Sequence, residues 1–435
     1  MNLSNRMEWF LILKGESIMT KLQEMGQKAK VASRVLATAG VKKDAALLSI
    51  ADDLVANVDK IITANKLDLE QARAGGMSES MLDRLTLNEA RIKDMAEGAR
   101  QVAAQTDPIG RILSGEVRPN GMKIEKVAVP LGVIGMIYEA RPNVTADAAV
   151  LCLKAGNAII LRGGKEAIHS NTAITEVMRD AVENAGLPRD SVQLIEDTTR
   201  QSAVELMALT EYLDVLVPRG GAGLIRSVKE NSRVPVIETG VGNCHVYVDE
   251  SADLEMAANI IFNSKTSRPS VCNAAETLLV HKAVAEQFLP VAKKMLDEKN
   301  VQLRADERAL QSLGACETVI PAVDDDWATE FSDYILAVRV VDSLDEAIEH
   351  ISKYSSGHSE AIVTKDYGNA RAFTSRVDAA AVYVNVSTRF TDGGQFGLGA
   401  EIGISTQKLH ARGPMGVNEL TSQKFIITGD GQIRV

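Results

Sequence analysis

A single cysteine carries the clearest chemical signal in the sequence. Cys272 lies in the stretch Lys265-Thr-Ser-Arg-Pro-Ser-Val-Cys-Asn-Ala-Ala-Glu276 and is followed by the apolar run Thr277–Val280. The run predicts a buried strand, and the Pro-containing segment before it predicts a turn that aims the thiol into a cleft. The thiolate is the nucleophilic form of cysteine, and cations such as Lys265 and Arg268 favour it. The pattern indicates covalent chemistry on an acyl group, although its spacing alone leaves a structural cysteine equally open.

The other cysteines, Cys152, Cys244 and Cys316, give weaker signals. Cys152 lies in an apolar helical stretch, and Cys316 has no basic neighbours. Cys244 adjoins His245, but neighbours in a strand point to opposite faces, so no thiol–imidazole pair is predicted. No C-x-x-C pair or zinc-type Cys/His spacing occurs, and we expect no metal site. So few cysteines in so long a chain favour a reducing, cytoplasmic compartment.

Two glycine-rich turns each follow a predicted strand and precede a predicted helix. They are Leu161-Arg-Gly-Gly-Lys-Glu166 and Pro218-Arg-Gly-Gly-Ala-Gly-Leu224. Glycines permit close backbone approach, and helix N-terminal amides favour anions, although either turn alone is more often only a turn. Two in one sheet suggest a dinucleotide, and a 2′-phosphate on Arg162 and Lys165 would favour NADPH over NADH. The expected cofactor-binding residues of these turns are Arg162, Gly163, Gly164, Lys165, Arg219, Gly220 and Gly221.

A third segment, Pro130–Asn143, runs from a strand into Glu139-Ala-Arg-Pro-Asn143. Polar residues at the carboxyl end of an α/β strand line the crevice where ligands bind. We expect Arg141 to receive a carboxylate or phosphate and Asn143 to donate to an oxyanion. A surface salt bridge is the alternative for Arg141.

The elements around these motifs alternate between strand and helix. Residues 20–105 read as helical, with a capping box at Thr86-Leu-Asn-Glu89, and an Asn-Gly turn within 112–129 predicts a hairpin. Strands are then predicted at 132–138, 158–161, 192–195, 214–217 and 234–237, and later at 277–280, 335–341, 361–363 and 381–385. Helical patterns separate most of them, which predicts a doubly wound α/β fold with mainly parallel sheets. A second β pair is expected around Gly429-Asp-Gly431.

Composition narrows the class of partner. The chain has 435 residues, a net charge of −10 and only 4% aromatic residues. These values argue against nucleic acid, and no apolar run is long enough for a membrane span. Basic clusters on an acidic chain suggest a small anionic ligand, and unpaired strand edges suggest a homo-oligomer.

Taken together, the segments resemble the γ-glutamyl phosphate reductase family of the aldehyde dehydrogenase superfamily. The resemblance covers roughly residues 20–435 and includes Ala347–Ile351, Ser355–Ile362 and Tyr383–Glu401. It implies an N-terminal extension at 1–18, an NADPH-binding domain, a catalytic domain and a β-hairpin oligomerisation arm. The implied bounds are 19–108 with 131–243 for the NADPH-binding domain, 244–411 for the catalytic domain, and 109–130 with 412–435 for the arm.

The resemblance also implies an activity: NADPH-dependent reduction of L-glutamyl 5-phosphate to L-glutamate 5-semialdehyde and phosphate in proline biosynthesis, with glutamate 5-kinase as a pathway partner. Cys272 would attack the γ-carbonyl and form a thioester, with Asn143 on the oxyanion side. Arg141, Arg268, Arg389 and His358 are the expected substrate-binding residues, and Glu330 matches the residue that binds the nicotinamide ribose.

Glu238 keeps an alternative open, because it lies where hydrolytic aldehyde dehydrogenases hold the Glu that activates water. The alternative is a hydrolytic NAD(P)-dependent semialdehyde dehydrogenase. A non-catalytic nucleotide sensor with the same fold is a third reading, and the intact Cys272 and basic turns count against it.

Overall fold

The computed structural model describes residues 19–434 and divides into two compact units. Unit 1 comprises the chain up to Ile237 together with the segment from Gly416 onward, and unit 2 comprises Glu238–Met415. Unit 2 therefore extends slightly beyond the expected catalytic domain at both ends. The expected extension at 1–18 lies outside the described residues.

Unit 1 begins with helices, as the sequence predicts. The first is fixed by a capping box in which the Thr20 side chain accepts from the Gln23 backbone and the Gln23 side chain accepts from the Thr20 backbone. The expected capping box at Thr86 is wrong, because the Asn88 side chain caps the helix instead and accepts from the Arg91 amide. The helices are α2 (Lys21–Leu36), α3 (Lys42–Ala56), α4 (Val58–Ala74), α5 (Glu79–Leu85) and α6 (Glu89–Ala104).

A parallel sheet with strand order β5-β4-β3-β6 follows. Every residue of β3 is buried, which is typical of a strand covered on both faces. The predicted strand at 234–237 is wrong: it forms only an isolated bridge between Leu216 and Val236, and Pro235 has no N–H for a ladder. The strands are β3 (Val133–Tyr138), β4 (Ala158–Gly163), β5 (Val192–Leu194) and β6 (Val215–Arg219), and the later helices of the unit are α7 (Asn143–Lys154), α8 (Ile168–Asn184), α9 (Arg200–Met207) and α10 (Ala222–Asn231).

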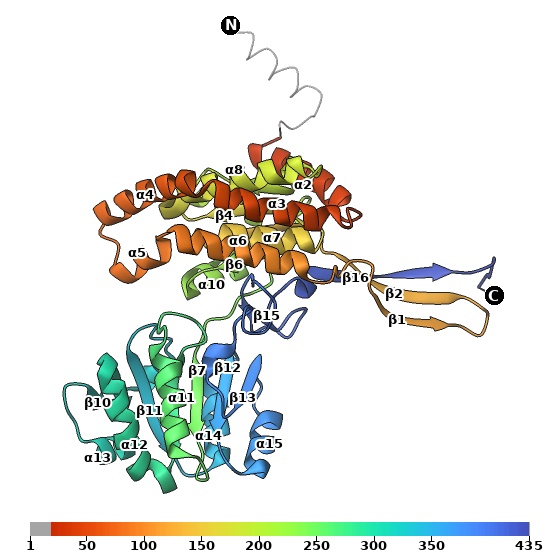
Figure 1. Cartoon of the computed structure of the whole chain (residues 1–435). Helices are drawn as coiled ribbons and strands as arrows, with labels where there is room; N and C mark the ends of the chain where they lie inside the picture. Colours follow the sequence, from red (N-terminus) through yellow and green to blue (C-terminus); the bar gives the residue numbers. More distant parts are fainter. Residues whose placement is uncertain (1–18, 435) are drawn as a thin grey trace. The chain divides into compact units, whose positions relative to one another are not determined.

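Unit 1 also carries a three-stranded antiparallel sheet, which we call the arm. It consists of β1 (Ile112–Val117), β2 (Lys123–Pro130) and β16 (Thr421–Thr428), with β2 in the middle. Figure 1 shows the arm extending away from the helices of the unit. The β pair expected around Gly429-Asp-Gly431 is wrong, since no strand follows β16 within residues 19–434 and β16 pairs with β2 instead.

Unit 2 contains a seven-stranded parallel sheet in the order β10-β9-β11-β8-β7-β12-β13. Its strands are β7 (Cys244–Val248), β8 (Ala275–His281), β9 (Gln302–Ala305), β10 (Val319–Pro321), β11 (Ile335–Val341), β12 (Ser359–Val363) and β13 (Ala381–Val384). Its helices are α11 (Leu254–Thr266), α12 (Lys282–Leu296), α13 (Glu307–Leu313), α14 (Leu344–Tyr354) and α15 (Tyr367–Arg376). A short antiparallel pair, β14 (Ile404–Ser405) and β15 (Gly413–Pro414), lies near the end of the unit. The predicted doubly wound α/β architecture is confirmed.

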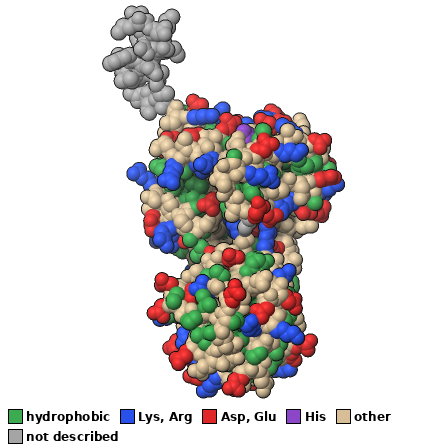
Figure 2. Space-filling view, turned by 90° about the vertical axis from the view of Figure 1, so that its left-hand side faces the viewer, with side chains coloured by type: hydrophobic (Ala, Val, Ile, Leu, Met, Phe, Trp, Pro, Cys, Tyr) green, Lys and Arg blue, Asp and Glu red, His purple; other side chains and the backbone are tan. Residues whose placement is uncertain are grey.

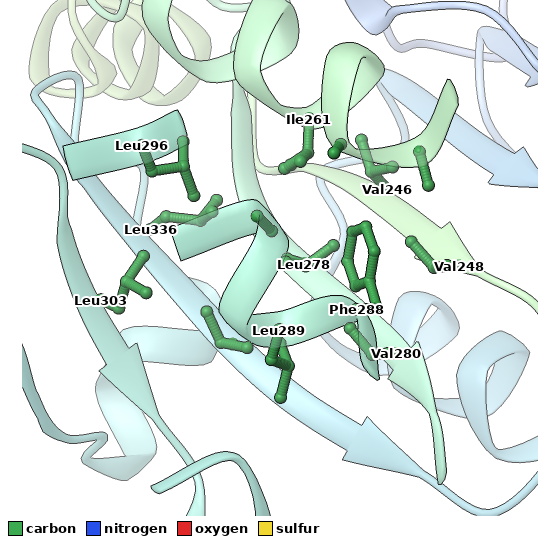
Figure 3. Packing of buried hydrophobic residues seen from close by; sticks show 14 of the residues in the cluster. Val246, Val248, Ile261, Leu278, Val280, Phe288, Leu289, Leu296, Leu303 and Leu336 are labelled. Atoms are coloured by element: carbon green, nitrogen blue, oxygen red, sulfur yellow. The ribbon is translucent and has the colours of Figure 1, made fainter. Parts of the chain in front are cut away.

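The core of unit 2 makes β8 a rigid support. Phe288 and Leu289 of α12 pack with Leu278 and Val280 of β8, and Ile261 of α11 belongs to the same buried cluster (Figure 3). Each of these side chains is at most 2% exposed. Burying one such side chain stabilises the fold by about 1.5–3 kcal/mol, so the start of β8 is held firmly in place.

The described surface mixes both signs of charge. On the face shown in Figure 2, Lys and Arg side chains alternate with Asp and Glu rather than forming one large basic area. Across residues 19–434, no helix is long and apolar enough to cross a membrane.

Candidate active site

Cys272 lies in a loop, residues 267–274, that connects the end of α11 to the start of β8. We call it the nucleophile loop. Cys272 is half-buried, whereas Cys152 and Cys244 are fully buried and Cys316 is exposed. Burial also raises the pKa of the Cys152 thiol well above its usual range, so Cys152 is inert core. Among the described cysteines, Cys272 combines partial exposure with a position at the amino edge of a buried strand.

A buried ion pair closes the base of the nucleophile loop. Lys265 precedes the loop and Glu276 follows it, and Lys265 Nζ lies 2.6 Å from Glu276 Oε2 with both side chains fully buried. Burial raises the pKa of Glu276 to about 7 and lowers the pKa of Lys265, because it disfavours both charges. The expectation that Lys265 activates the thiolate is therefore revised: its charge is directed to Glu276, while Arg268 remains an exposed cation within the loop.

Arg389 ties the loop together at its open end. Its Nε donates to Ser267 Oγ at 2.9 Å, and its Nη1 donates to Asn273 Oδ1. Asn273 is 4% exposed, and its Nδ2 donates to the carbonyl oxygens of Thr391 at 2.9 Å and Arg389 at 3.2 Å. Burial lowers the pKa of Arg389. Arg389 was expected to bind substrate, and two of its nitrogen atoms, Nε and Nη1, instead hold the nucleophile loop.

His358 does not face solvent in unit 2, contrary to its expected position at a substrate mouth. Its side chain is fully buried, and its Nδ1 lies 2.8 Å from Ser359 Oγ and 3.8 Å from Cys244 Sγ. The strand order β8-β7-β12 explains the contact, because it brings the starts of these strands together behind the nucleophile loop. Cys244 pairs with this distant histidine and not with His245, as strand alternation requires.

In unit 1, the sheet order gathers the predicted anion-binding segments. The carboxyl ends of β4, β3 and β6 are adjacent, and the chain reverses its direction of travel across the sheet between β3 and β6. Gly221 N donates to Glu139 Oε2 at 2.9 Å, and Ala140 N donates to Glu166 Oε1 at 3.0 Å. These contacts bring residues after the three strands into one cluster.

The glycines of this cluster differ in the space around them. A Cβ added at Gly163 or Gly164 would lie 2.2 Å from Asn171 Nδ2 or Glu166 Oε1, and one at Gly220 would lie 2.6 Å from Glu139 Cδ, so side chains of the unit itself pack against these three glycines. A Cβ added at Gly223 would meet nothing within 4 Å, and one at Gly221 would meet only Glu139 Oε2 at 3.8 Å. The Gly221 amide already donates to the Glu139 carboxylate, so a phosphate bound at this helix N-terminus would replace that carboxylate as the acceptor. Lys165 is exposed at the start of the turn that follows β4, as a phosphate-binding cation should be.

Arg162 is partly engaged by its own unit. Its Nη2 donates to the carbonyl oxygens of Thr198 and Thr199, each at 2.8 Å. Burial lowers the pKa of this guanidinium. A guanidinium has five N–H donors, so Arg162 keeps donors for a ligand while the backbone contacts fix its direction.

The expected oxyanion donor, Asn143, begins α7. Its Nδ2 donates to Asp147 Oδ2 at 2.9 Å, which uses one of the two amide hydrogens. Arg141 lies two residues earlier, half-buried, and its carbonyl accepts from the Val144 amide at 3.0 Å. Both residues follow β3 at the carboxyl edge of the sheet, where they were predicted.

The two carboxylates singled out by the resemblance, Glu238 and Glu330, lie in unit 2. Glu238 N donates to Gln407 Oε1 at 2.9 Å, and Gln407 Nε2 donates to Glu238 Oε1 at 3.2 Å. Glu330 is half-buried ahead of β11. Its charge also contributes to the raised pKa of Glu276, after burial. Glu238 is thus held by a paired contact with an amide side chain.

Comparison with known proteins identifies the family. The model described as "Aldehyde dehydrogenase family" matches residues 18–314 and 324–426. The chain belongs to the aldehyde dehydrogenase family. A relative from Carboxydothermus hydrogenoformans named gamma-glutamyl phosphate reductase is 60% identical over 417 residues, which cover 96% of this chain and 100% of the relative. A relative of the same name from Heliobacterium modesticaldum is 59% identical over 418 residues, with the same coverage.

A solved structure agrees with these relatives. The crystal structure of gamma-glutamyl phosphate reductase from Thermotoga maritima is 50% identical, has a TM-score of 0.92, and covers 96% of this chain and 100% of its own. At this similarity the fold and its order of elements are shared along the whole alignment.

Sequence reasoning missed the residues behind the nucleophile. Asn273 lies within the nucleophile loop and donates to the Thr391 carbonyl, while Cys244 and Gly242 contact the loop, and none of the three was predicted to serve the site. A Cβ added at Gly242 would lie 1.5 Å from the Cys272 carbonyl oxygen. The two glycines of Glu238-Thr-Gly-Val-Gly242 were the available signal, since close backbone approach requires glycine.

Proposed function

We infer that this chain reduces L-glutamyl 5-phosphate to L-glutamate 5-semialdehyde and phosphate, a step of proline biosynthesis. The observation that carries the inference is its 60% identity to a gamma-glutamyl phosphate reductase over that relative's whole length. The half-buried Cys272 in a loop closed by ion pairing and by Arg389 supplies the chemistry that such a reaction needs.

The first step is nucleophilic attack. The Cys272 thiolate forms a C–S bond to the γ-carbonyl carbon, and the carbonyl π electrons move onto oxygen. The Cys272 backbone N–H and the remaining amide hydrogen of Asn143 are the proposed oxyanion donors. The C–O bond to phosphate then breaks, and the phosphate leaves with the bonding electrons, stabilised by Arg141 and Arg268. A thioester on Cys272 remains.

A nicotinamide cofactor held by the turns after β4 and β6 would supply the hydride for reduction of this thioester. The resulting thiohemiacetal collapses to the semialdehyde, and Cys272 leaves as a thiolate ready for another turnover. We assign cofactor binding to the turns after β4 and β6, with Lys165 and Arg162 at a 2′-phosphate and Glu330 at the nicotinamide ribose. The exposed Lys165 supports NADPH as the preferred form, because a cation at that position can pair with a 2′-phosphate.

Substrate recognition is assigned to the loop that carries Arg389. The segment Asp392–Gly397 continues from it, and Asp392 Oδ1 accepts from the amides of Gly394 at 2.9 Å and Gln395 at 3.1 Å. This turn and the remaining donors of Arg389 are our candidates for the amino-acid end of the substrate. His358 is reassigned, because a fully buried ring acts through its neighbours.

A hydrolytic dehydrogenase would require Glu238 to activate a water molecule. The Gln407 amide bound to that carboxylate supports a structural role for Glu238 instead. The phosphate-releasing reduction, and not a hydrolytic oxidation, is therefore the activity that we propose.

The arm supports a homo-oligomer. Phe425, Ile426 and Ile427 of β16 are 64%, 40% and 60% exposed, and such strand-edge apolar residues favour pairing with a second copy. We propose an oligomer in the cytoplasm that receives its unstable acyl phosphate from glutamate 5-kinase. Light scattering of wild type and Phe425→Glu tests the arm: a smaller mass for the variant supports it, and an unchanged mass refutes it.

A burst experiment tests the function. Enzyme is mixed with L-glutamyl 5-phosphate, generated by glutamate 5-kinase, in the absence of a nicotinamide cofactor. The mechanism predicts rapid release of about one phosphate per Cys272 and a matching mass increase on the peptide that contains it. Cys272→Ala is the control and should release none. A wild-type burst without modification of Cys272 would reject the thioester.

A further inference from the structure

Buried polar groups form a chain behind the nucleophile loop. Cys244 Sγ donates to the Cys272 carbonyl oxygen at 3.2 Å, and its sulfur lies 3.8 Å from His358 Nδ1. The same ring nitrogen lies 2.8 Å from Ser359 Oγ. Cys244, His358 and Ser359 are all fully buried, so water does not compete for these contacts.

The chain continues until it returns to the loop. Ser359 Oγ lies 2.6 Å from Thr391 Oγ1, and the Thr391 carbonyl accepts from Asn273 Nδ2 at 2.9 Å. The path that begins at the Cys272 carbonyl therefore ends on the side chain of the next residue. We call the set Cys244, His358, Ser359, Thr391 and Asn273 the polar circuit.

The Cys272 carbonyl is held sterically as well. A Cβ built on Gly242 would lie 1.5 Å from that oxygen and 2.5 Å from Cys272 Cα, so only glycine fits. The adjoining Asn243 fixes Gly242, because its Nδ2 donates to the carbonyl oxygens of Trp327 and Tyr354, each at 2.8 Å. The Cys272–Asn273 peptide thus has a backbone wall on one side and a hydrogen-bond donor beside it.

We propose that Gly242, Cys244 and His358 are positioning residues that fix the Cys272–Asn273 peptide, and with it the direction of the nucleophile. They act through Cys272 and do not touch substrate. Catalysis depends on orientation, because a reacting group displaced by about 1 Å can lose on the order of 10²-fold in rate. The inference rests on the role of Cys272 in the proposed function.

The protonation state of Cys244 is consistent with this role. Burial raises the pKa of its thiol well above the usual range, and the charge of Glu360 acts in the same direction. Cys244 therefore remains an S–H donor at neutral pH, while the half-buried Cys272 takes the reactive role.

The test compares Cys244→Ala, Cys244→Ser and Gly242→Ala with wild type. Cys316→Ser is the matched control, because Cys316 is an exposed cysteine of the same unit. Four quantities are measured: kcat and KM for semialdehyde oxidation, the pH-dependent rate of Cys272 alkylation by iodoacetamide, and the melting temperature. Peptide mass spectrometry assigns alkylation to Cys272 alone.

Loss of the thiol donor should reduce kcat of Cys244→Ala about tenfold, with KM within about twofold, and should shift the pH profile of Cys272 alkylation. Cys244→Ser should recover most of kcat, since a hydroxyl also donates. Gly242→Ala should lose more of its kcat, about 10²-fold, and should still bind NADPH. Cys316→Ser should match wild type.

Wild-type kcat and alkylation in both Cys244→Ala and Gly242→Ala would overturn the proposal. A second outcome would also overturn it: Cys244→Ser fails to recover kcat, the losses in kcat parallel the losses in melting temperature, and the pH profile of Cys272 alkylation is unchanged. Alkylation of Cys272 needs no substrate, so the alkylation measurement remains decisive if the assigned acyl phosphate is wrong.

Discussion

The buried ion pair at the base of the nucleophile loop gives a double-mutant prediction. Lys265 Nζ and Glu276 Oε2 lie 2.6 Å apart with neither side chain exposed. At an effective dielectric constant of about 20, that separation corresponds to about 6 kcal/mol of attraction. Desolvation costs several kcal/mol for each ion, and the raised pKa of Glu276 and lowered pKa of Lys265 both reflect it.

The two terms nearly cancel for the pair but not for either member alone. We expect Lys265→Met and Glu276→Leu each to lower the free energy of unfolding by about 3–5 kcal/mol, because each leaves one buried charge. The double variant should come within about 1–2 kcal/mol of wild type. The Ser332 amide that donates to Glu276 belongs to an exposed residue, so water can replace its acceptor.

Tryptophan fluorescence can assign the unfolding to unit 2. The chain has two tryptophans, Trp9 and Trp327, and Trp327 is buried in unit 2. In a Trp9→Phe background, urea unfolding at pH 8 followed by fluorescence reports on that unit. Single variants that lose less than about 1 kcal/mol, or a double variant no more stable than the weaker single, would refute the reasoning.

Three further predictions concern pH, cofactor choice and the loop. The pKa of Glu276 is about 7 in the folded protein against an ordinary 4.5, so its contribution to stability is present below pH 4.5 and is lost as pH rises through about 7. Glu276→Gln should therefore reduce the change in the free energy of unfolding over that pH window, measured with urea, by about 3 kcal/mol. An unchanged pH dependence in the variant would contradict this. Lys165→Ala should weaken NADPH binding about tenfold and NADH binding less than twofold in fluorescence titrations, because only NADPH carries the 2′-phosphate, and equal losses would remove Lys165 from that site. A lysine in Arg389→Lys cannot keep both the Ser267 and the Asn273 contacts, so steady-state kinetics should show kcat reduced about 10–100-fold. A wild-type kcat in this variant would show that the two Arg389 contacts are dispensable.

Much of the fold could be predicted because its elements are locally encoded. The strand at 335–341 has the predicted bounds, since an apolar run of strand length is bounded there by turn residues. The run at 234–237 forms no strand because Pro235, which is visible in the sequence, has no N–H for a ladder, so its apolar neighbours were a poor guide. The terminal β pair failed because β16 finds its partner in β2, far away in the sequence.

The candidate site shows the same limit. Cys272 could be selected because its neighbours in sequence are also informative. The polar circuit could not be predicted, because sheet order, and not sequence proximity, brings Cys244 beside His358. Lys265 was misread for a similar reason: its partner, Glu276, lies on the other side of the loop, and only the fold shows that both are buried.

Phosphate dependence of the reverse reaction tests the central claim most directly. Enzyme, L-glutamate 5-semialdehyde and NADP are combined with and without inorganic phosphate, and NADPH formation is followed by absorbance. A thioester on Cys272 that is resolved by phosphate predicts sustained turnover only when phosphate is present, and none in Cys272→Ala. Sustained turnover of the wild type without phosphate would contradict the account and would identify a hydrolytic dehydrogenase.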